Sequence, residues 1–322
     1  MKFVDSSFEI IPQENGMDGL YKHVEKVARI SYKSEDKITE DSAKKMVDTL
    51  IKNKHLACLE HGTIYLKFPL IFAALSTKYH TNPYSRISKK SDDYIYVTTN
   101  WRVIIENHWE EDLKYLSEPT EYHEKRYTVK FITSIGVGRE FTRHRGMSHM
   151  QESTRFCNYS KGKFNSELTY IIPEWIYDCQ AKRASCVDWP TNEPKDWLME
   201  YHGEELVRIM TTEDRSVAAY VDLLRSIERD YLFLTTSEES YQLKAQEARG
   251  ILPLDLKGEL IMTGFTKDWI HFFNLRSYIA MTGKAHPDAM VLANNLLNEF
   301  LERKYINYTD LYGKDKLLVK ES

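Results

Sequence analysis

One short stretch, residues 143–160, concentrates groups that can bind an anion. It contains three guanidinium groups, those of Arg143, Arg145 and Arg155, together with two histidines, a carboxylate and several hydroxyls. Guanidinium is permanently charged, and its rigid fork of donors matches the geometry of phosphate. So dense a polar set cannot be buried without partners. The stretch therefore predicts either a solvated loop or a site built to hold an anion.

The arrangement of the charges favours the anion site. On a strand, Arg143 and Arg145 would point to the same side, and like charges side by side repel unless an anion bridges them. His144 could donate to a ligand ring or form a structural hydrogen bond to a carbonyl. The segment Gln151–Arg155 adds hydroxyls, amides and a third arginine suited to a nucleotide phosphate.

Three further segments carry polar groups in unusual settings. Residues 55–63 place two histidines and Glu60 just before a predicted strand. Arg249 stands close to the end of a predicted helix before Leu-Pro, where surface charge is the simplest interpretation. Lys267, His271 and Arg276 lie roughly along one side of a predicted helix, and a charged Arg276 among apolar neighbours is costly unless it is paired.

Other chemistries find less support in the sequence. Ser153 has no evident partnered base, so a hydrogen-bonding role is favoured over a nucleophilic one, and Cys157 is expected to pack. The four cysteines show no CxxC pair and no zinc spacing, so no metal is expected. Neither glycine-rich phosphate loop occurs, so a flavin or nicotinamide cofactor would bind outside a Rossmann unit.

The hydrophobic pattern predicts the elements that must position these residues. In the first part of the chain, helices are expected over 18–31 and from Thr39 or Asp41 through Ile51. In the second part, they are expected over 204–234, as one helix or a bent pair, and over 240–251. Two more are expected to begin at a Thr266 cap and at Pro287. Strands are expected over 63–68, 129–141 leading directly into Arg143, 168–172 and 259–262. Without strict βαβ alternation, this mixture predicts an α+β fold. We expect a single domain over 1–322, with an ordered insertion at about 70–126.

Composition narrows the class of protein. The 322-residue chain is 42% hydrophobic and 29% charged, which is typical of a soluble globular enzyme. A net charge of −4 argues against binding nucleic acid through the whole surface. No apolar run suits a signal peptide or a membrane span. We expect a cytoplasmic protein with free thiols and no membrane or nucleic-acid partner.

The order Arg143-His144-Arg145, seven residues, then Ser153 resembles the signature of the flavin-dependent thymidylate synthases, the thymidylate synthase complementing protein family. Arg29–Ser31, 55–63, 249–253 and 265–276 are similar to further family segments, in the same order. The resemblance implies a mixed or antiparallel central sheet flanked by helices, a non-Rossmann flavin site, and a homotetramer with shared active sites. It also implies conversion of dUMP to dTMP, with methylenetetrahydrofolate as the carbon donor and FAD reduced by NADPH.

The same resemblance assigns roles to individual residues. The catalytic residue is Arg276, which would stabilise negative charge on the N3/O4 side of the uracil. The residues implied for dUMP are Glu140, Arg143, Gln151, Glu152, Ser153, Thr154, Arg155, Arg249 and Arg276. The residues implied for FAD are Ser31, His61, Thr63, Arg143, His144, Arg145, Gln151, Phe265, Lys267 and His271.

The chain departs from the family pattern at several positions. Arg143 follows His61 by 82 positions, a far longer separation than in many members. Gln151 stands where many members have Glu, with Glu152 one place later, while Phe156 and His271 replace a common Tyr and Asn. Two alternatives stay open: transfer of a methyl or hydroxymethyl group to another uracil-type nucleotide, and an RNA-binding module that uses Arg143, Arg145 and nearby aromatics.

Overall fold

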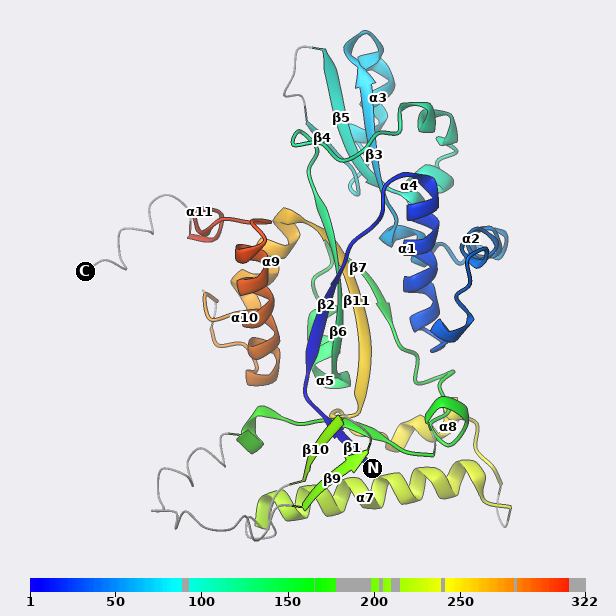
Figure 1. Ribbon diagram of the computed structural model, residues 1–322, viewed down its shortest axis with the longest axis vertical. Helices are drawn as coiled ribbons and strands as arrows, with labels where there is room; N and C mark the ends of the chain where they lie inside the picture. Colours follow the sequence, from blue (N-terminus) through cyan, green and yellow to red (C-terminus); the bar gives the residue numbers. More distant parts are fainter. Residues whose placement is uncertain are drawn as a thin grey trace, which may run out of the picture.

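A four-stranded antiparallel sheet forms the centre of the computed structural model (Figure 1). The model describes residues 1–88, 93–164, 166–177, 198–202, 205–209, 215–238, 241–280 and 283–312. The strand order is β2 (Ser7–Ile11), β6 (Arg126–Ser134), β11 (Lys257–Phe265) and β7 (Ser148–Gln151). β11 pairs with β6 along its whole length, from Lys257 opposite Ser134 to Phe265 opposite Arg126.

Helices cover both faces of this sheet (Figure 1). On one face, α1 (Gly16–Ile30) packs Val27 and Ile30 against Ile11 and Ile261 of the sheet. On the other face, a large aromatic core that includes Phe131, Trp269 and Phe300 fills the space under four helices. These helices are α5 (Ile135–Phe141), α9 (Thr266–Arg276), α10 (Pro287–Glu302) and α11 (Tyr308–Tyr312). The prediction of an α+β fold with a central antiparallel sheet flanked by helices is confirmed.

A second, three-stranded sheet holds much of the segment between about 70 and 126. Its strand order is β3 (Thr63–Pro69), β5 (Tyr94–Asn100) and β4 (Arg86–Ser88). It has its own core around Leu66, Phe68 and Tyr79. The short helical elements near it are 3-10 helix Leu56–His61, 3-10 helix Leu70–Phe72, α3 (Ala73–His80), α4 (Trp101–Glu106) and 3-10 helix Glu110–Tyr115, and α2 (Ser42–Lys52) packs on α1.

A third group of elements lies at the other end of the central sheet, with α7 running across it (Figure 1). Its core includes Phe3, Tyr170, Val217 and Tyr231. The elements are β1 (Lys2–Val4) parallel to β8 (Thr169–Ile171), the hairpin of β9 (Leu198–His202) and β10 (Glu205–Ile209), α7 (Arg215–Thr236), α8 (Ala245–Ala248) and 3-10 helix Arg249–Ile251. No helix in the described ranges is long and apolar enough to cross a membrane.

Several predicted elements are confirmed. The helices expected over 18–31, from Asp41 and from Pro287 are α1, α2 and α10, and Pro287 occupies the first turn as expected. The strands expected over 63–68, 168–172 and 259–262 are β3, β8 and the longer β11.

The strand predicted over 129–141 is wrong in its second half. β6 ends at Ser134, whose Oγ accepts a hydrogen bond from the backbone N–H of Val137 and caps α5. Val137 and Phe141 are four residues apart, so both face the core from a helix. Arg143 and Arg145 consequently lie in a turn after α5, and the prediction that they share one side of a strand is wrong.

Three helix predictions also need correction. The long helix begins only at Arg215, because residues 205–209 form β10. The helix expected over 240–251 is reduced to α8 followed by a 3-10 turn. Thr266 does not cap α9: it is the first residue of the helix, and the carboxylate of Asp268 accepts from the backbone N–H of Phe265 at 2.9 Å.

Candidate active site

Arg276, at the end of α9, is joined to two residues of the Arg143 region. Its Nη1 donates to Glu140 Oε2 at 2.7 Å, its Nη2 to the Glu140 carbonyl at 3.1 Å, and its Nε to His144 Nε2 at 3.2 Å. The fork of the guanidinium is therefore fixed by α5 and the turn that follows it. The sequence predicted that the charge of Arg276 needs a partner, and Glu140 is that partner. Arg276 lies more than 130 positions from Glu140 and His144 in the sequence.

His144 is held neutral in this cluster. Burial, followed by the positive charge of Arg276, lowers the pKa of His144 to about 4. Because Nε2 accepts from Arg276, the neutral ring carries its proton on Nδ1. This buried Nδ1 has no hydrogen-bond partner among the described residues. The His271 ring centroid lies 5.9 Å from that of His144, so His144 offers a donor beside another predicted site residue.

We expect NMR titration to show His144 gaining its proton near pH 4, and Arg276→Ala to raise that pKa while leaving it below 6.5, because burial remains. Between pH 6.5 and 4 the unfolded chain binds more protons at this residue, so His144 lowers stability as pH falls through that window. His23, also lowered to about 4, is the control, because Arg276 is not a cause of its shift. Titration of His144 near 6.5 in the unaltered protein would contradict the burial argument.

A cleft of about 480 Å³ opens where β6, β7 and β11 meet the α8 segment. Two exposed guanidiniums, Arg139 of α5 and Arg249, border it, and neither forms an ion pair within the described part of the chain. Gln151, Glu152 and Thr154 also line it. Arg155 lies close to the same segment, since its Nε donates to Gln246 Oε1 at 3.3 Å. The cleft thus brings four of the predicted dUMP residues, Gln151, Glu152, Thr154 and Arg249, together with Arg139.

A buried group of charges stands behind this cleft. The carboxylate of Glu259 pairs with the ammonium groups of Lys33, Lys130 and Lys257. Burial alone would raise the pKa of Glu259, but Lys257 and Lys33 outweigh it and lower the pKa to about 2. Glu152 lies beside these lysines and has a raised pKa, because its burial outweighs the attraction of Lys257 and Lys33.

A second cleft, of about 580 Å³, lies between α1, α2 and the 150s segment. Ser31 and Ser153 line it, and the backbone N–H of Ser153 donates to the Ser31 carbonyl at 3.2 Å. Two exposed rings, Tyr32 and Phe156, stand at its edge with centroids 4.8 Å apart. Gln151 lines both clefts, and a Cβ added at Gly138 would lie 3.4 Å from Gln151 Nε2. The side chain of Gln151 therefore separates the two clefts.

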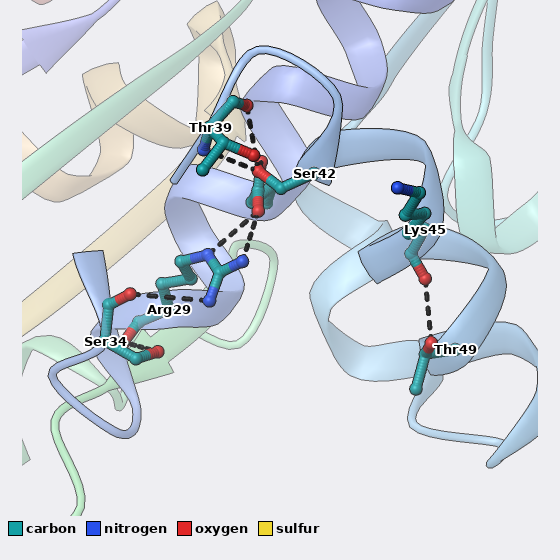
Figure 2. Close-up of polar contacts among 7 residues, drawn as sticks. Arg29, Ser34, Thr39, Ser42, Lys45 and Thr49 are labelled. Carbon is teal, nitrogen blue, oxygen red and sulfur yellow. Dashed lines mark hydrogen bonds and ion pairs between the residues drawn. The ribbon is translucent and has the colours of Figure 1, made fainter. Parts of the chain in front are cut away.

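The end of α1 that carries Ser31 is fixed by a buried ion pair. Figure 2 shows Arg29, whose Nε and Nη2 donate to Glu25 Oε1 at 2.9 and 2.6 Å. Ser42 Oγ, at the start of α2, donates to the other oxygen of Glu25. These bonds tie α2 to the last turn of α1, directly before Ser31.

Two residues predicted to contact FAD, His61 and Thr63, lie in the interior. His61 is fully buried, with Nδ1 2.8 Å from Thr263 Oγ1, and burial lowers its pKa well below the usual value. Thr63 Oγ1 accepts from the buried guanidinium of Arg126 at 3.2 Å. The His61 Nε2 atom is buried without a hydrogen-bond partner in the described part of the chain.

Other predicted cofactor residues have more open surroundings. Arg143 and Arg145 are exposed in their turn, and Lys267 and His271 are exposed on α9. Phe265 is instead buried, with the guanidiniums of Arg86 and Arg126 4.7 and 5.4 Å from its ring centroid. Arg86 belongs to β4, so the segment after β3 reaches the end of β11 next to the predicted cofactor residues.

The two cysteines in the described ranges are buried and are not set up as nucleophiles. Cys157 is buried in the core around Phe3 and Tyr170, and burial followed by Glu152 raises the pKa of its thiol to about 12. Cys58 is also a free, buried thiol, while Cys179 and Cys186 lie outside the described residues. No group of three His, Cys, Asp or Glu side chains in the described ranges could hold a metal ion.

Comparison with known families decides the affiliation. Residues 119–303, more than half of the chain, match the family described as thymidylate synthase complementing protein (Thy1). The chain belongs to this family. The matched residues contain β6, β7, β11 and α9, and with them every arginine of the Arg276 cluster and the first cleft.

The solved structures that this chain resembles include those of PolB from Streptomyces cacaoi, a UMP/dUMP methylase. Its complex with 5-Br dUMP has a TM-score of 0.39 at 14% identity over 94% of this chain and 93% of that one. Its complex with 5-Br UMP has a TM-score of 0.40 at 14% identity over 94% and 91%. A search of curated proteins finds no match.

Several residues of the candidate site in this member of the family were not predicted from the sequence. Arg139 lay within the strand predicted over 129–141 and was given no role, whereas helix α5 places it at the cleft. Thr133 and Glu259 carry no motif. Lys33 and Lys257 are separated from Glu152 by more than 100 positions, so no local spacing could have predicted their contact. A lysine-carboxylate alternation within β11, Lys257 and Glu259, was the one available signal.

Proposed function

We propose that this protein is a flavin-dependent thymidylate synthase that converts dUMP to dTMP. Methylenetetrahydrofolate would supply the carbon, and FAD reduced by NADPH would supply the hydride. The observation that carries the proposal is the joining of Arg276 to Glu140 and His144 in a chain of this family. The cleft bordered by Arg139 and Arg249 supports it as a place for the nucleotide.

The phosphate of dUMP would bind at the open side of the cleft. Arg139 and Arg249 present guanidiniums there that form no ion pair with the described residues, Thr154 lines the same cleft, and Ser153 and Arg155 are its neighbours in sequence. Bidentate guanidinium contacts suit a phosphate dianion. The cleft volume lies within the range usual for small-molecule sites.

Arg276 would stabilise the negative charge that develops on the uracil ring. Its fork is held by Glu140 and by the neutral His144, so little reorganisation is needed when charge appears. His144 keeps the cluster from gaining a second positive charge at neutral pH. Glu140 is the positioning residue of this set.

The surroundings of His144 fit a flavin. The Nδ1–H of His144 has no partner among the described residues and would be a donor for a ring acceptor, and the exposed Arg143, Arg145 and Lys267 can hold the cofactor's phosphates. A bound flavin supplies hydride chemistry that no side chain provides. Because these cations are exposed on one chain, we also propose that they serve sites shared between subunits of a homotetramer.

The absorption spectrum of the purified protein tests the proposal. We expect a flavin spectrum that NADPH bleaches under anaerobic conditions, and formation of dTMP from dUMP and methylenetetrahydrofolate, identified by mass spectrometry. A product heavier by a hydroxymethyl rather than a methyl group would reassign the transfer. A colourless protein that binds RNA in a strongly salt-dependent way would overturn the proposal.

A further inference from the structure

Arg86, at the start of β4, is bonded on one side of its guanidinium and open on the other. Its Nη1 donates to the carbonyls of Pro83 and Ser85, at 2.9 Å in each case. Its Nε and Nη2 form no hydrogen bond or ion pair with any described residue, and neither atom is fully buried. These two nitrogens form the fork that binds carboxylates and phosphates, and Arg29 uses the same pair to bind Glu25. Closing the turn before β4 accounts for the bonds of Nη1 but not for the open fork.

The ring of Phe265 helps to set the position of this fork. The guanidinium carbon of Arg86 lies 4.7 Å from the centroid of the ring, within the range of a cation–π contact. Phe265 is the last residue of β11 and directly precedes α9. The fork of Arg86 therefore lies at the junction of β11 and α9, although β4 belongs to the separate three-stranded sheet.

Positive charge exceeds negative charge at this junction. The guanidinium carbon of Arg126 lies 5.4 Å from the centroid of the same ring, and Arg126 donates to a hydroxyl and a carbonyl rather than to a carboxylate. Asp268 is influenced by both arginines, but within the described part of the chain it forms no ion pair with either and already accepts from the N–H of Phe265. Two guanidiniums beside one ring repel each other. A bound anion would relieve that repulsion.

A phosphate group fits this surplus of positive charge better than a carboxylate does. Lys267, two positions after Phe265, adds an exposed ammonium to the two guanidiniums, while Asp268 supplies one opposing charge. A phosphate has more acceptor oxygens than a carboxylate, so it can accept from the fork of Arg86 and from a second cation at the same time. The junction therefore suits a ligand that carries a phosphate.

We propose that the open fork of Arg86 binds a phosphate group of a dinucleotide, so that the segment between about 70 and 126 forms part of the cofactor site. The inference rests on the proposed function, because that function supplies two dinucleotides, FAD and NADPH. Arg86 is a positioning residue: it holds the dinucleotide by its phosphate and takes no part in the transfer itself. The segment that separates His61 from Arg143 then has a binding role of its own.

The test measures the affinity of the full-length, flavin-loaded protein for both dinucleotides. Release of FAD on dilution is followed by the fluorescence of free flavin, and binding of NADP⁺, which cannot reduce the flavin, is followed by calorimetric titration. We expect Arg86→Ala to weaken binding of one dinucleotide by about 10- to 100-fold, the range for a hydrogen bond to a charged group. A loss confined to FAD assigns the fork to the FAD pyrophosphate, and a loss confined to NADP⁺ assigns it to a phosphate of the nicotinamide dinucleotide.

Two further variants keep the test decisive. Arg86→Lys keeps the charge but loses the fork, and should weaken the same dinucleotide to a smaller extent, so a folding defect in Arg86→Ala does not end the experiment. Lys114→Ala is the matched control, because it removes one exposed positive charge from the same segment, beside Tyr115, and should leave both affinities unchanged. Unchanged affinities in both Arg86 variants, or an equal loss in Lys114→Ala, overturns the inference. A protein that binds neither dinucleotide refutes the proposed function instead.

Discussion

Replacing Arg276 with alanine is expected to lower the rate of dTMP formation at least 10²- to 10³-fold, the scale seen when one donor to a developing charge is removed. The fold should survive, because the guanidinium is 18% exposed and its partner Glu140 is 34% exposed, so water can replace the lost bonds at Glu140. Steady-state turnover and circular dichroism measure the two effects. Arg276→Lys keeps the charge but loses the fork, and should recover only part of the rate.

The matched control for Arg276→Ala is Arg303→Ala. Arg303 also pairs with one carboxylate, Glu299, but on the exposed side of α10. We expect its turnover to be unchanged. Near-normal turnover in Arg276→Ala would show that the cluster with Glu140 and His144 is not the centre of the reaction.

Replacing Glu25 with alanine is expected to lower the free energy of unfolding by about 3–5 kcal/mol, because it leaves the charge of Arg29 buried without a partner. The side chains of Arg29 and Glu25 are only 9% and 2% exposed. Urea unfolding followed by circular dichroism measures the change. The substitution should also make the position of Ser31 less rigid, because Ser31 directly follows α1.

Asp48→Ala provides the comparison for this prediction. Lys44 and Asp48 form an ion pair with the same four-residue spacing on α2, but their side chains are 69% and 59% exposed. Solvent screens such a pair, so its loss should leave the free energy of unfolding nearly unchanged. Equal effects of the two substitutions would show that the burial of the Glu25–Arg29 pair contributes nothing.

The fold could be predicted where local patterns and the tertiary structure agree. Pro287 began its helix as expected, and the alternation of Ile64, Leu66 and Phe68 gave a strand. Residues 135–141 failed because Val137 and Phe141 satisfy both a strand and a helix period, and the capping hydroxyl of Ser134 decided between them. The helix over 204–234 failed because its first part pairs with β9, a contact that periodicity cannot distinguish.

The site could be predicted in its charged residues but not in their contacts. The cost of an unpaired Arg276 predicted a partner, yet nothing in the sequence named Glu140 or His144 as that partner. The buried charges around Glu152 come from β6, from β11 and from the turn after α1, so the sheet register and the packing of α1 together bring them into contact. The prediction that Arg143 and Arg145 point to the same side was wrong, because the two residues lie in a turn after α5 and not on a strand.

Gln151 lines both clefts, so we expect a ligand that reorients its amide in one cleft to change the affinity of the other cleft. Linkage would then require the same factor in the reverse direction. A Cβ added at Gly138 would lie in ordinary contact with Gln151 Nε2, at 3.4 Å, so the residue at position 138 borders the space in which this amide can turn. The total binding free energy of two ligands would then be the same whichever ligand binds first. The affinity measured for one ligand would depend on whether the other cleft is occupied.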